Sequence, residues 1–207
     1  MLLTPLHATF FLSSVLLALS PGPDNLFVLI HSAQHGTRSG LMVVLGLCSG
    51  LLFHTAAVAL GLAALLAASP VSLRLLTSMG AAYLLWLAWQ SWHAGDVTTD
   101  NAQSTPLSPR QSYLRGVWMN ISNPKVGLFF LAFLPQFVQA DVALTAWQQV
   151  CLLGGFFMLA ALGVFGCIAL GAGRWGPVWL AAKGWQTRLH KMAALLFVAL
   201  GLRLLWV

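Results

Sequence analysis

The sequence has few charged residues and no glutamate. Only 7% of its 207 residues are charged, and its four acidic residues are all aspartates. A soluble globular domain carries about 25% charged residues, so this chain has too few polar side chains to cover a surface that faces water. Hydrophobic residues make up 59% of the chain, and the mean hydropathy is +0.84. These values exclude a soluble enzyme, a disordered tail and a secreted disulfide-rich domain, and they predict an all-α integral membrane protein.

Cysteine is also scarce. The three cysteines, Cys48, Cys151 and Cys167, form an odd set in apolar surroundings and contain no C-x-x-C pair. A buried free cysteine behaves as a small hydrophobic residue. We therefore interpret all three as packing residues, and we expect no disulfide, no metal site and no thiol-redox relay from them.

Clusters of basic residues are absent, although the net charge is +6. A nucleic-acid-binding surface needs lysines and arginines gathered on one face, whereas the ten basic residues here are spread singly along the chain. Their spacing is typical of the ends of membrane spans. We therefore expect no nucleic-acid partner, and we use these residues to predict orientation.

Long apolar segments with little or no charge are abundant. A helix needs about 20 apolar residues to cross the hydrocarbon core of a bilayer. Six segments meet this requirement, and a polar stretch, residues 93–112, separates the third from the fourth and predicts one long loop. The six predicted spans are residues 6–31, 40–67, 71–92, 113–138, 144–171 and 189–206.

The loops differ in basic charge, which predicts the orientation. The faces that carry both termini and the even-numbered loops hold Arg74 and Arg203. The odd-numbered loops hold seven basic residues: Arg38, Arg110, Arg115, Arg174, Lys183, Arg188 and Lys191. With six spans, this places the odd-numbered loops in the cytoplasm and both termini in the periplasm. No lysine or arginine precedes Arg38, so we expect the first span to be retained and not cleaved as a signal peptide.

The six spans form two triplets that resemble each other. Residues 1–93 and residues 113–207 each begin with a proline-interrupted span, and the polar cytoplasmic loop 94–112 joins them. Pro23 and Pro124 are each followed at once by a charged residue. Three spans repeated once must have opposite orientations in the membrane, so the sequence predicts a 3+3 inverted repeat within a single transport domain, as in many secondary transporters.

The two interruptions predict a cavity. Proline has no N–H and clashes with the carbonyl four residues back, so Pro21, Pro23 and Pro124 leave backbone groups without helical partners. Such groups are tolerated inside a bilayer only where protein or a water-filled cavity satisfies them. A helix that restarts after the break also presents free N–H groups, which favour a carboxylate. Gly22 completes the first helix-break motif.

Asp24 and Lys125 lie further from any predicted span end than the other charged residues. An ionisable side chain inside the membrane is a candidate functional residue, because burying it unpaired costs several kcal/mol. We predict that Lys125 binds a substrate carboxylate and that Asp24 binds a substrate ammonium group or a coupling proton. The alternative is a structural ion pair that holds the two halves together.

Further polar residues accompany these two. Asn25, Asn120 and Asn123 lie beside the breaks and are candidates either for substrate binding or for satisfying exposed backbone groups. His54 lies near the centre of the second span, where it could carry a proton or bond across to another helix.

Glycines recur at helical spacing, and we interpret them as packing residues. Their faces fit contacts within one protomer or between the two protomers of a homodimer. Residues 36–40, GTRSG, instead predict the tight cytoplasmic turn between the first two spans.

Several motifs resemble one known family. Residues 20–28 read SPGPDNLFV and are followed by GTRSG at 36–40, while residues 116–125 read GVWMNISNPK and lead into FFLAFLPQF at 129–137. The third span contributes GAAYLLW at 80–86. Together these motifs resemble the LysE-type amino-acid exporters, in particular their homoserine/threonine resistance branch.

The resemblance implies a bacterial inner-membrane protein without cofactors that exports amino acids from the cytoplasm by using the proton gradient. Substrates in this branch are small or aliphatic amino acids such as homoserine, threonine and leucine. The matching positions are Pro21, Pro23 and Asp24 in the first motif, and Asn123, Pro124 and Lys125 in the second.

The sequence thus favours a proton antiporter for neutral amino acids, with small substrates, protons and lipid as its partners. A passive channel or a membrane-embedded structural partner is the alternative. An intramembrane enzyme is disfavoured, because Ser49 in GLCSG misses the spacing of a rhomboid-like G-x-S-G motif.

Overall fold

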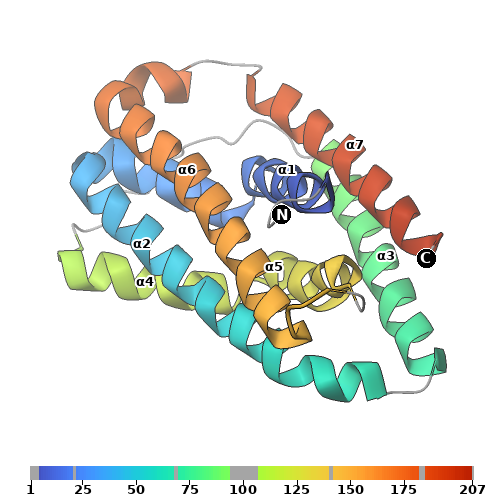
Figure 1. The fold of residues 1–207 in the computed structure, drawn as a ribbon. Helices are drawn as coiled ribbons and strands as arrows, with labels where there is room; N and C mark the ends of the chain where they lie inside the picture. Colours follow the sequence, from blue (N-terminus) through green and yellow to red (C-terminus); the bar gives the residue numbers. More distant parts are fainter. Residues whose placement is uncertain are drawn as a thin grey trace.

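The fold is built from helices. The computed structural model describes residues 5–20, 22–67, 70–93, 107–139, 142–181 and 185–206, and these contain helices and no strand, as predicted. Figure 1 shows their arrangement. The elements are α1 Pro5–Leu19, α2 Pro23–Ala67, α3 Pro70–His93, α4 Pro109–Ile121, α5 Pro124–Leu128, the π-helical turn η1 Phe129–Phe133, the 3₁₀ turn η2 Leu134–Phe137, α6 Ala146–Ala181 and α7 Trp185–Leu205.

Two helices in the described part of the chain are long and apolar enough to cross a membrane. They are Pro23–Gly61 within α2 and Ala146–Trp175 within α6, with mean hydropathies of 2.0 and 2.3. A third span is formed if the bent pair Pro109–Ile121 and Pro124–Phe137, which meet at 47°, counts as one. The chain is therefore a membrane protein, and its described residues hold two or three helices of this kind.

Helix α2 is folded back on itself at Gly36. This glycine has φ +81° and ψ 166°, a backbone conformation that residues with a Cβ rarely adopt. The Nε2 of His31 lies 2.8 Å from the Oγ of Ser39, although eight residues would span about 12 Å along a straight helix. The turn predicted from GTRSG is thus confirmed, and Figure 1 shows the chain reversing there.

Glycines allow α2 and α4 to cross with their backbones in contact. A methyl group on Gly46 would overlap the carbonyl of Tyr113, and one on Gly116 would overlap the carbonyl of Val43. Close approach of this kind is the usual role of small residues in membrane helices. The crossing sets the direction of α4 and hence the position of the break that follows it.

This crossing leads to a stability prediction. Because no side chain fits there without moving the backbone, Gly46→Leu is expected to cost about 3 kcal/mol and to lower the Tm in detergent by about 6–12 °C. Gly163→Leu is the matched control, because a Cβ at Gly163 meets nothing within 4 Å. Equal Tm values for the two variants, measured on purified protein, would contradict the close crossing.

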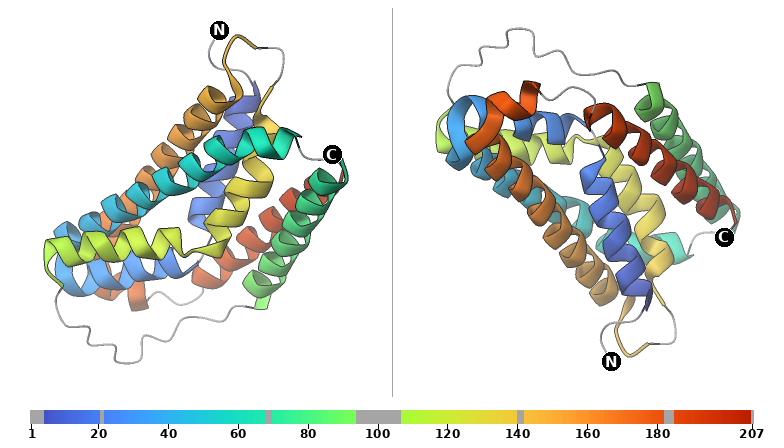
Figure 2. Two further views of the ribbon diagram at one scale, coloured as in Figure 1. Left: turned by 90° about the horizontal axis from the view of Figure 1, so that it is seen from below. Right: turned by 90° about the horizontal axis from the view of Figure 1, so that it is seen from above.

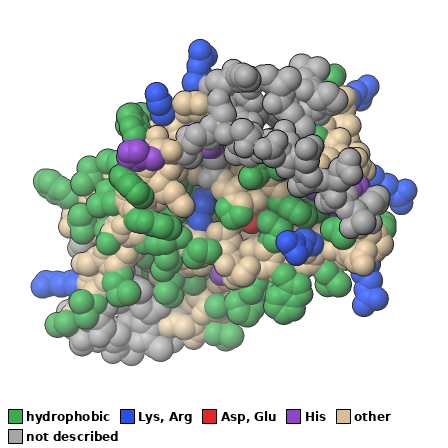
Figure 3. Space-filling view, turned by 180° about the vertical axis from the view of Figure 1, so that it is seen from behind, with side chains coloured by type: hydrophobic (Ala, Val, Ile, Leu, Met, Phe, Trp, Pro, Cys, Tyr) green, Lys and Arg blue, Asp and Glu red, His purple; other side chains and the backbone are tan. Residues whose placement is uncertain are grey.

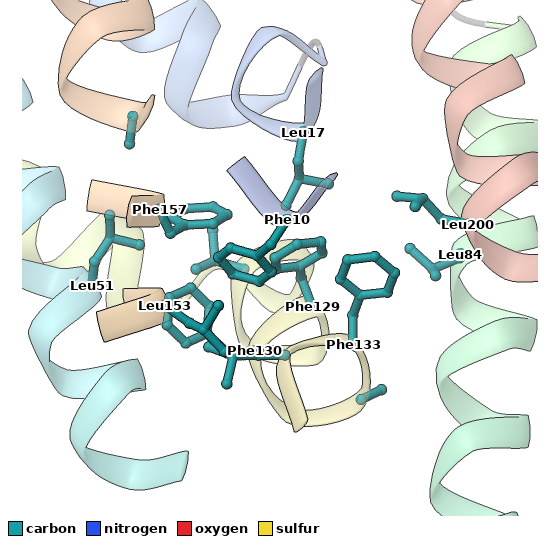
Figure 4. Packing of buried hydrophobic residues seen from close by; sticks show 14 of the residues in the cluster. Phe10, Leu17, Leu51, Leu84, Phe129, Phe130, Phe133, Leu153, Phe157 and Leu200 are labelled. Carbon is teal, nitrogen blue, oxygen red and sulfur yellow. The ribbon is translucent and has the colours of Figure 1, made fainter. Parts of the chain in front are cut away.

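An aromatic cluster surrounds the second break. Figure 4 shows Phe10 of α1 and Phe157 of α6 packed around the rings of η1. The ring of Phe129 lies 6.1 Å from that of Phe10 and 5.4 Å from that of Phe157. Helices α3 and α7 run side by side along one edge of the molecule in both views of Figure 2, and they contribute Leu84 and Leu200 to the same core. The core therefore supports the segment that carries Lys125.

Candidate functional site

The first break separates α1 from α2. Helix α1 ends at Leu19 and α2 restarts at Pro23, while Pro21 lies outside the described residues. Two carbonyls freed by the break are satisfied by side chains. The Nδ2 of Asn25 donates to the carbonyl of Ala18 at 2.6 Å, and the Nζ of Lys125 donates to the carbonyl of Ser20 at 2.7 Å. A side chain from the second half of the chain therefore completes the backbone of the first break.

The second break separates α4 from α5. The Oδ1 of Asn123 accepts from the backbone N–H of Lys125 at 3.0 Å and so caps the helix that restarts at Pro124. Proline at this position removes the donor four residues on from the carbonyl of Asn120, which accepts instead from the backbone N–H of Asn123 at 3.0 Å. The Nε2 of His54 lies 3.0 Å from that carbonyl, and since an oxygen of this kind only accepts, Nε2 carries the hydrogen. Helix α2 thus supplies a second donor at the second break.

Asp24 links the two breaks. Its carboxylate is almost fully buried, and its Oδ2 accepts from the Nδ2 of Asn123 at 2.8 Å. Its other oxygen, Oδ1, is buried without a hydrogen-bond partner among the described residues, and the same is true of the Oδ1 of Asn120. Buried acceptors of this kind are costly unless a ligand or water satisfies them.

One cavity brings these side chains together. Its polar lining consists of Gly22, Asp24, Asn25, Asn120, Asn123 and Lys125. It encloses about 330 Å³ with its mouth included, and little of that space is wide enough for a water molecule. On the face shown in Figure 3, acidic atoms are visible in one place only, in a hollow near the centre and close to basic atoms.

The two charges in this cavity have separate partners. Lys125 is bonded to a backbone carbonyl and Asp24 to an amide, so among the described residues they lie in one cavity without a direct ion pair. His54 does not line the cavity, and its Nε2 instead contacts the backbone carbonyl of Asn120. Pro23 and Pro124 begin the helices that follow the two breaks.

A comparison with known families identifies the chain. The model of the LysE type translocator family matches residues 15–206. The chain belongs to this family. No solved structure matches the chain.

Curated relatives of this translocator include proteins named for efflux. An uncharacterized membrane protein of Vibrio cholerae is 32% identical over 94% of each chain. A homoserine/homoserine lactone efflux protein of Salmonella typhi is 34% identical over 62% of this chain and 63% of its own length. A leucine efflux protein of Klebsiella pneumoniae is 30% identical over 65% of this chain and 64% of its own length.

The translocator also has a polar cluster that the sequence did not reveal. His31 is 2% exposed, and its Nε2 lies 2.8 Å from the Oγ of Ser39 and 3.2 Å from the Oγ of Ser112. These contacts join the turn of α2 to the first turns of α4. The spacing of His31 and Ser39 predicts such a contact only once the reversal at Gly36 is known.

The apolar lining of the cavity was also missed. It consists of Leu17, Ala18, Val126, Phe157 and Phe165. In the sequence these residues have the pattern of an ordinary membrane span, since nothing distinguishes a wall of a cavity from a packed helix face. As for metal ions, the described residues contain no group of three histidine, cysteine or acidic side chains that could hold one.

Proposed function

We propose that this translocator is a secondary active exporter that carries neutral amino acids resembling threonine, homoserine or leucine out of the cytoplasm in exchange for protons. The observation that carries the proposal is one cavity between two helix breaks that contains a lysine and a carboxylate with an unpartnered oxygen. Membership of the LysE type translocator family and relatives named for homoserine and leucine efflux support it.

The cavity is complementary to a zwitterion. An ammonium group donates three hydrogen bonds, and the Oδ1 atoms of Asp24 and Asn120 are acceptors that await donors. A substrate carboxylate would accept from the Nζ of Lys125 and replace the carbonyl of Ser20, its present partner. Because the cavity is too narrow for an amino acid as it stands, binding requires the two breaks to move apart. Substrate binding is thereby linked to opening.

We further propose six spans arranged as a 3+3 inverted repeat. The reversal at Gly36 divides α2 into the end of a broken first span and a complete second span. Helix α1 of the first half packs on α6 of the second half. Helix α4, the counterpart of α1, packs on α2, the counterpart of α6. A two-fold relation between the halves requires this reciprocal packing. The halves are residues 1–93 and 113–207 of a single transport domain, and most of the loop 94–112 lies outside the described residues.

The proposed location is the inner membrane of a bacterium, with both termini in the periplasm. The charge difference between the odd-numbered loops and the other faces supports this orientation. The partners are the amino acid, protons and lipid. The glycines of α6 that meet nothing within 4 Å, namely Gly155, Gly163 and Gly166, leave a face open for lipid or for a homodimer.

The test is substrate counterflow in proteoliposomes with a panel of labelled amino acids at two pH values. A carrier loaded with unlabelled substrate accelerates uptake of label, whereas a passive channel does not. Failure of every neutral amino acid to exchange would contradict the proposed export function.

An enzyme centred on Ser49 is disfavoured, because the Oγ of Ser49 accepts from the hydroxyl of Tyr113 at 2.9 Å and donates to the carbonyl of Leu45. Ser49→Ala is expected to retain exchange.

The contact of His54 leads to a separate prediction. We propose that this histidine positions Asn120, since its Nε2–H donates to the Asn120 carbonyl, and that Asp24 and not His54 carries the proton. His54→Phe leaves that carbonyl without its donor from α2, and we expect the KM of exchange to rise about tenfold. His54→Gln keeps an amide donor and is expected to keep both the KM and the pH profile within about twofold. Loss of the pH response in His54→Gln would instead assign the proton to His54.

A further inference from the structure

The cavity has two chemically different walls. The polar wall lies at the helix breaks, and the apolar wall is formed by Leu17 and Ala18 of α1, Val126 of α5, and Phe157 and Phe165 of α6. Ammonium and carboxylate groups are common to all amino acids, so a polar wall that binds them does not distinguish one amino acid from another. Selection among amino acids therefore depends on the apolar wall.

We propose that Phe165 and Ala18 set the size of the substrate side chain and that this side chain is aliphatic. The inference rests on the proposed export of amino acids and names the residues that choose among them. Both positions line the cavity, and both are buried, at 6% and 4% exposure. A large residue on α6 and a small one on α1 leave a space of limited size between the two helices, which pack against each other.

Phe165 differs from Phe157, the other ring of this wall. The ring of Phe157 lies 5.4 Å from that of Phe129 and 5.1 Å from that of Phe130, so the aromatic core fixes it. Phe165 follows eight residues later, about 12 Å further along α6. Phe165 belongs to the hydrophobic core, but among the described residues its ring has no aromatic neighbour, so its truncation leaves the ring contacts around the second break in place.

The chemistry of the wall favours aliphatic side chains over hydroxylated ones. Leu17, Ala18, Val126 and the two phenylalanines offer no side-chain hydrogen-bond partner. A substrate hydroxyl placed against them would lose its hydrogen bonds with water, at a cost of about 1–3 kcal/mol. Leucine and valine are therefore expected to bind about tenfold or more tightly than threonine and homoserine.

The test measures how strongly unlabelled leucine, valine, phenylalanine and threonine compete in counterflow of labelled leucine into proteoliposomes. Phe165→Ala removes a ring from the wall, so the potency of phenylalanine relative to valine is expected to rise about tenfold. Ala18→Leu fills the same space, so this ratio is expected to fall about tenfold. Because both expectations concern a ratio, differences in the amount of active protein cancel.

Phe156→Ala is the matched control. Phe156 neighbours Phe157 on α6 but packs against His7 and Phe11, outside the cavity. In Phe156→Ala, the potency of phenylalanine relative to valine is expected to equal that of the wild-type protein. For any variant that does not exchange, the same ratio is measured as ligand-induced stabilisation in detergent, which needs no transport.

Two results would overturn the inference. One is a potency of phenylalanine relative to valine that is unchanged in both Phe165→Ala and Ala18→Leu. The other is a wild-type protein that prefers threonine to leucine. A wild-type protein that exchanges no amino acid would contradict the proposed function itself, and the two failures are thereby distinguished.

Discussion

Replacing Lys125 by alanine is expected to reduce amino-acid exchange about 100-fold or more. Lys125 provides the cationic side chain of the cavity lining, and its Nζ is the proposed donor to the substrate carboxylate. Truncating one partner of a buried, hydrogen-bonded charge pair costs about 2–5 kcal/mol, which corresponds to this loss. The variant also leaves the carbonyl of Ser20 without its donor and Asp24 without a nearby positive charge, so the free energy of unfolding is expected to fall as well.

A double variant separates the two effects. Lys125→Ala combined with Asp24→Asn removes both charges, so we expect the amount of inserted, folded protein to recover while exchange stays lost. Lys191→Ala is the control, because its Nζ lies 5.8 Å from the centre of the Trp92 ring and outside the cavity. The measurement is the initial counterflow rate per inserted protein. Wild-type exchange by the double variant would make Lys125 a structural residue.

Asp24→Asn is expected to uncouple transport from the pH gradient. Asparagine has nearly the same shape as aspartate and retains an oxygen for the substrate ammonium group, but it cannot bind and release a proton. For one-to-one exchange, one unit of pH difference supports a tenfold substrate ratio across the membrane. When the periplasmic side is acidic, the wild-type protein should therefore concentrate substrate on that side about tenfold per unit of pH difference. Asp24→Asn should not concentrate substrate on either side.

The measurement requires proteoliposomes in which the membrane potential is held at zero, because exchange of a proton for a zwitterion moves charge. A protonophore added to the wild-type protein should reproduce the behaviour of Asp24→Asn. His54→Gln serves as the second control, since it changes the other candidate for proton coupling. An unchanged response to the pH gradient in Asp24→Asn would remove Asp24 from the coupling mechanism.

Several features of the site were predictable because they depend on the local backbone. Pro23 and Pro124 begin α2 and α5 where the sequence placed the restarts, since a proline in the first turn loses no helical hydrogen bond. Gly36 lies at the reversal of α2 for an equally local reason, its positive φ. The candidates Asp24, Asn123 and Lys125 followed from these positions, because charge beside a break inside lipid needs an explanation.

Other features were not predictable, because they depend on which helices meet. Asn25 has a local partner, but His54 bonds to a carbonyl 66 residues away. The apolar wall and the cluster of His31, Ser39 and Ser112 also bring together residues from different helices. The sequence marked His54 as a candidate, but no pattern within one helix identifies its partner, or distinguishes the residues of the wall and the cluster from ordinary packing residues.

By itself, the sequence determined the class of protein, the helix breaks and the motifs of its family. Scarce charge requires a lipid environment, and proline removes backbone hydrogen bonds wherever it occurs, so both conclusions hold for any packing of the helices. Only the tertiary structure decided what satisfies the broken backbone. The Ser20 carbonyl is bonded by Lys125, 105 residues away, and one oxygen of Asp24 has no hydrogen-bond partner among the described residues. Such partners depend on how the two halves pack, because a side-chain hydrogen bond forms only within about 3 Å.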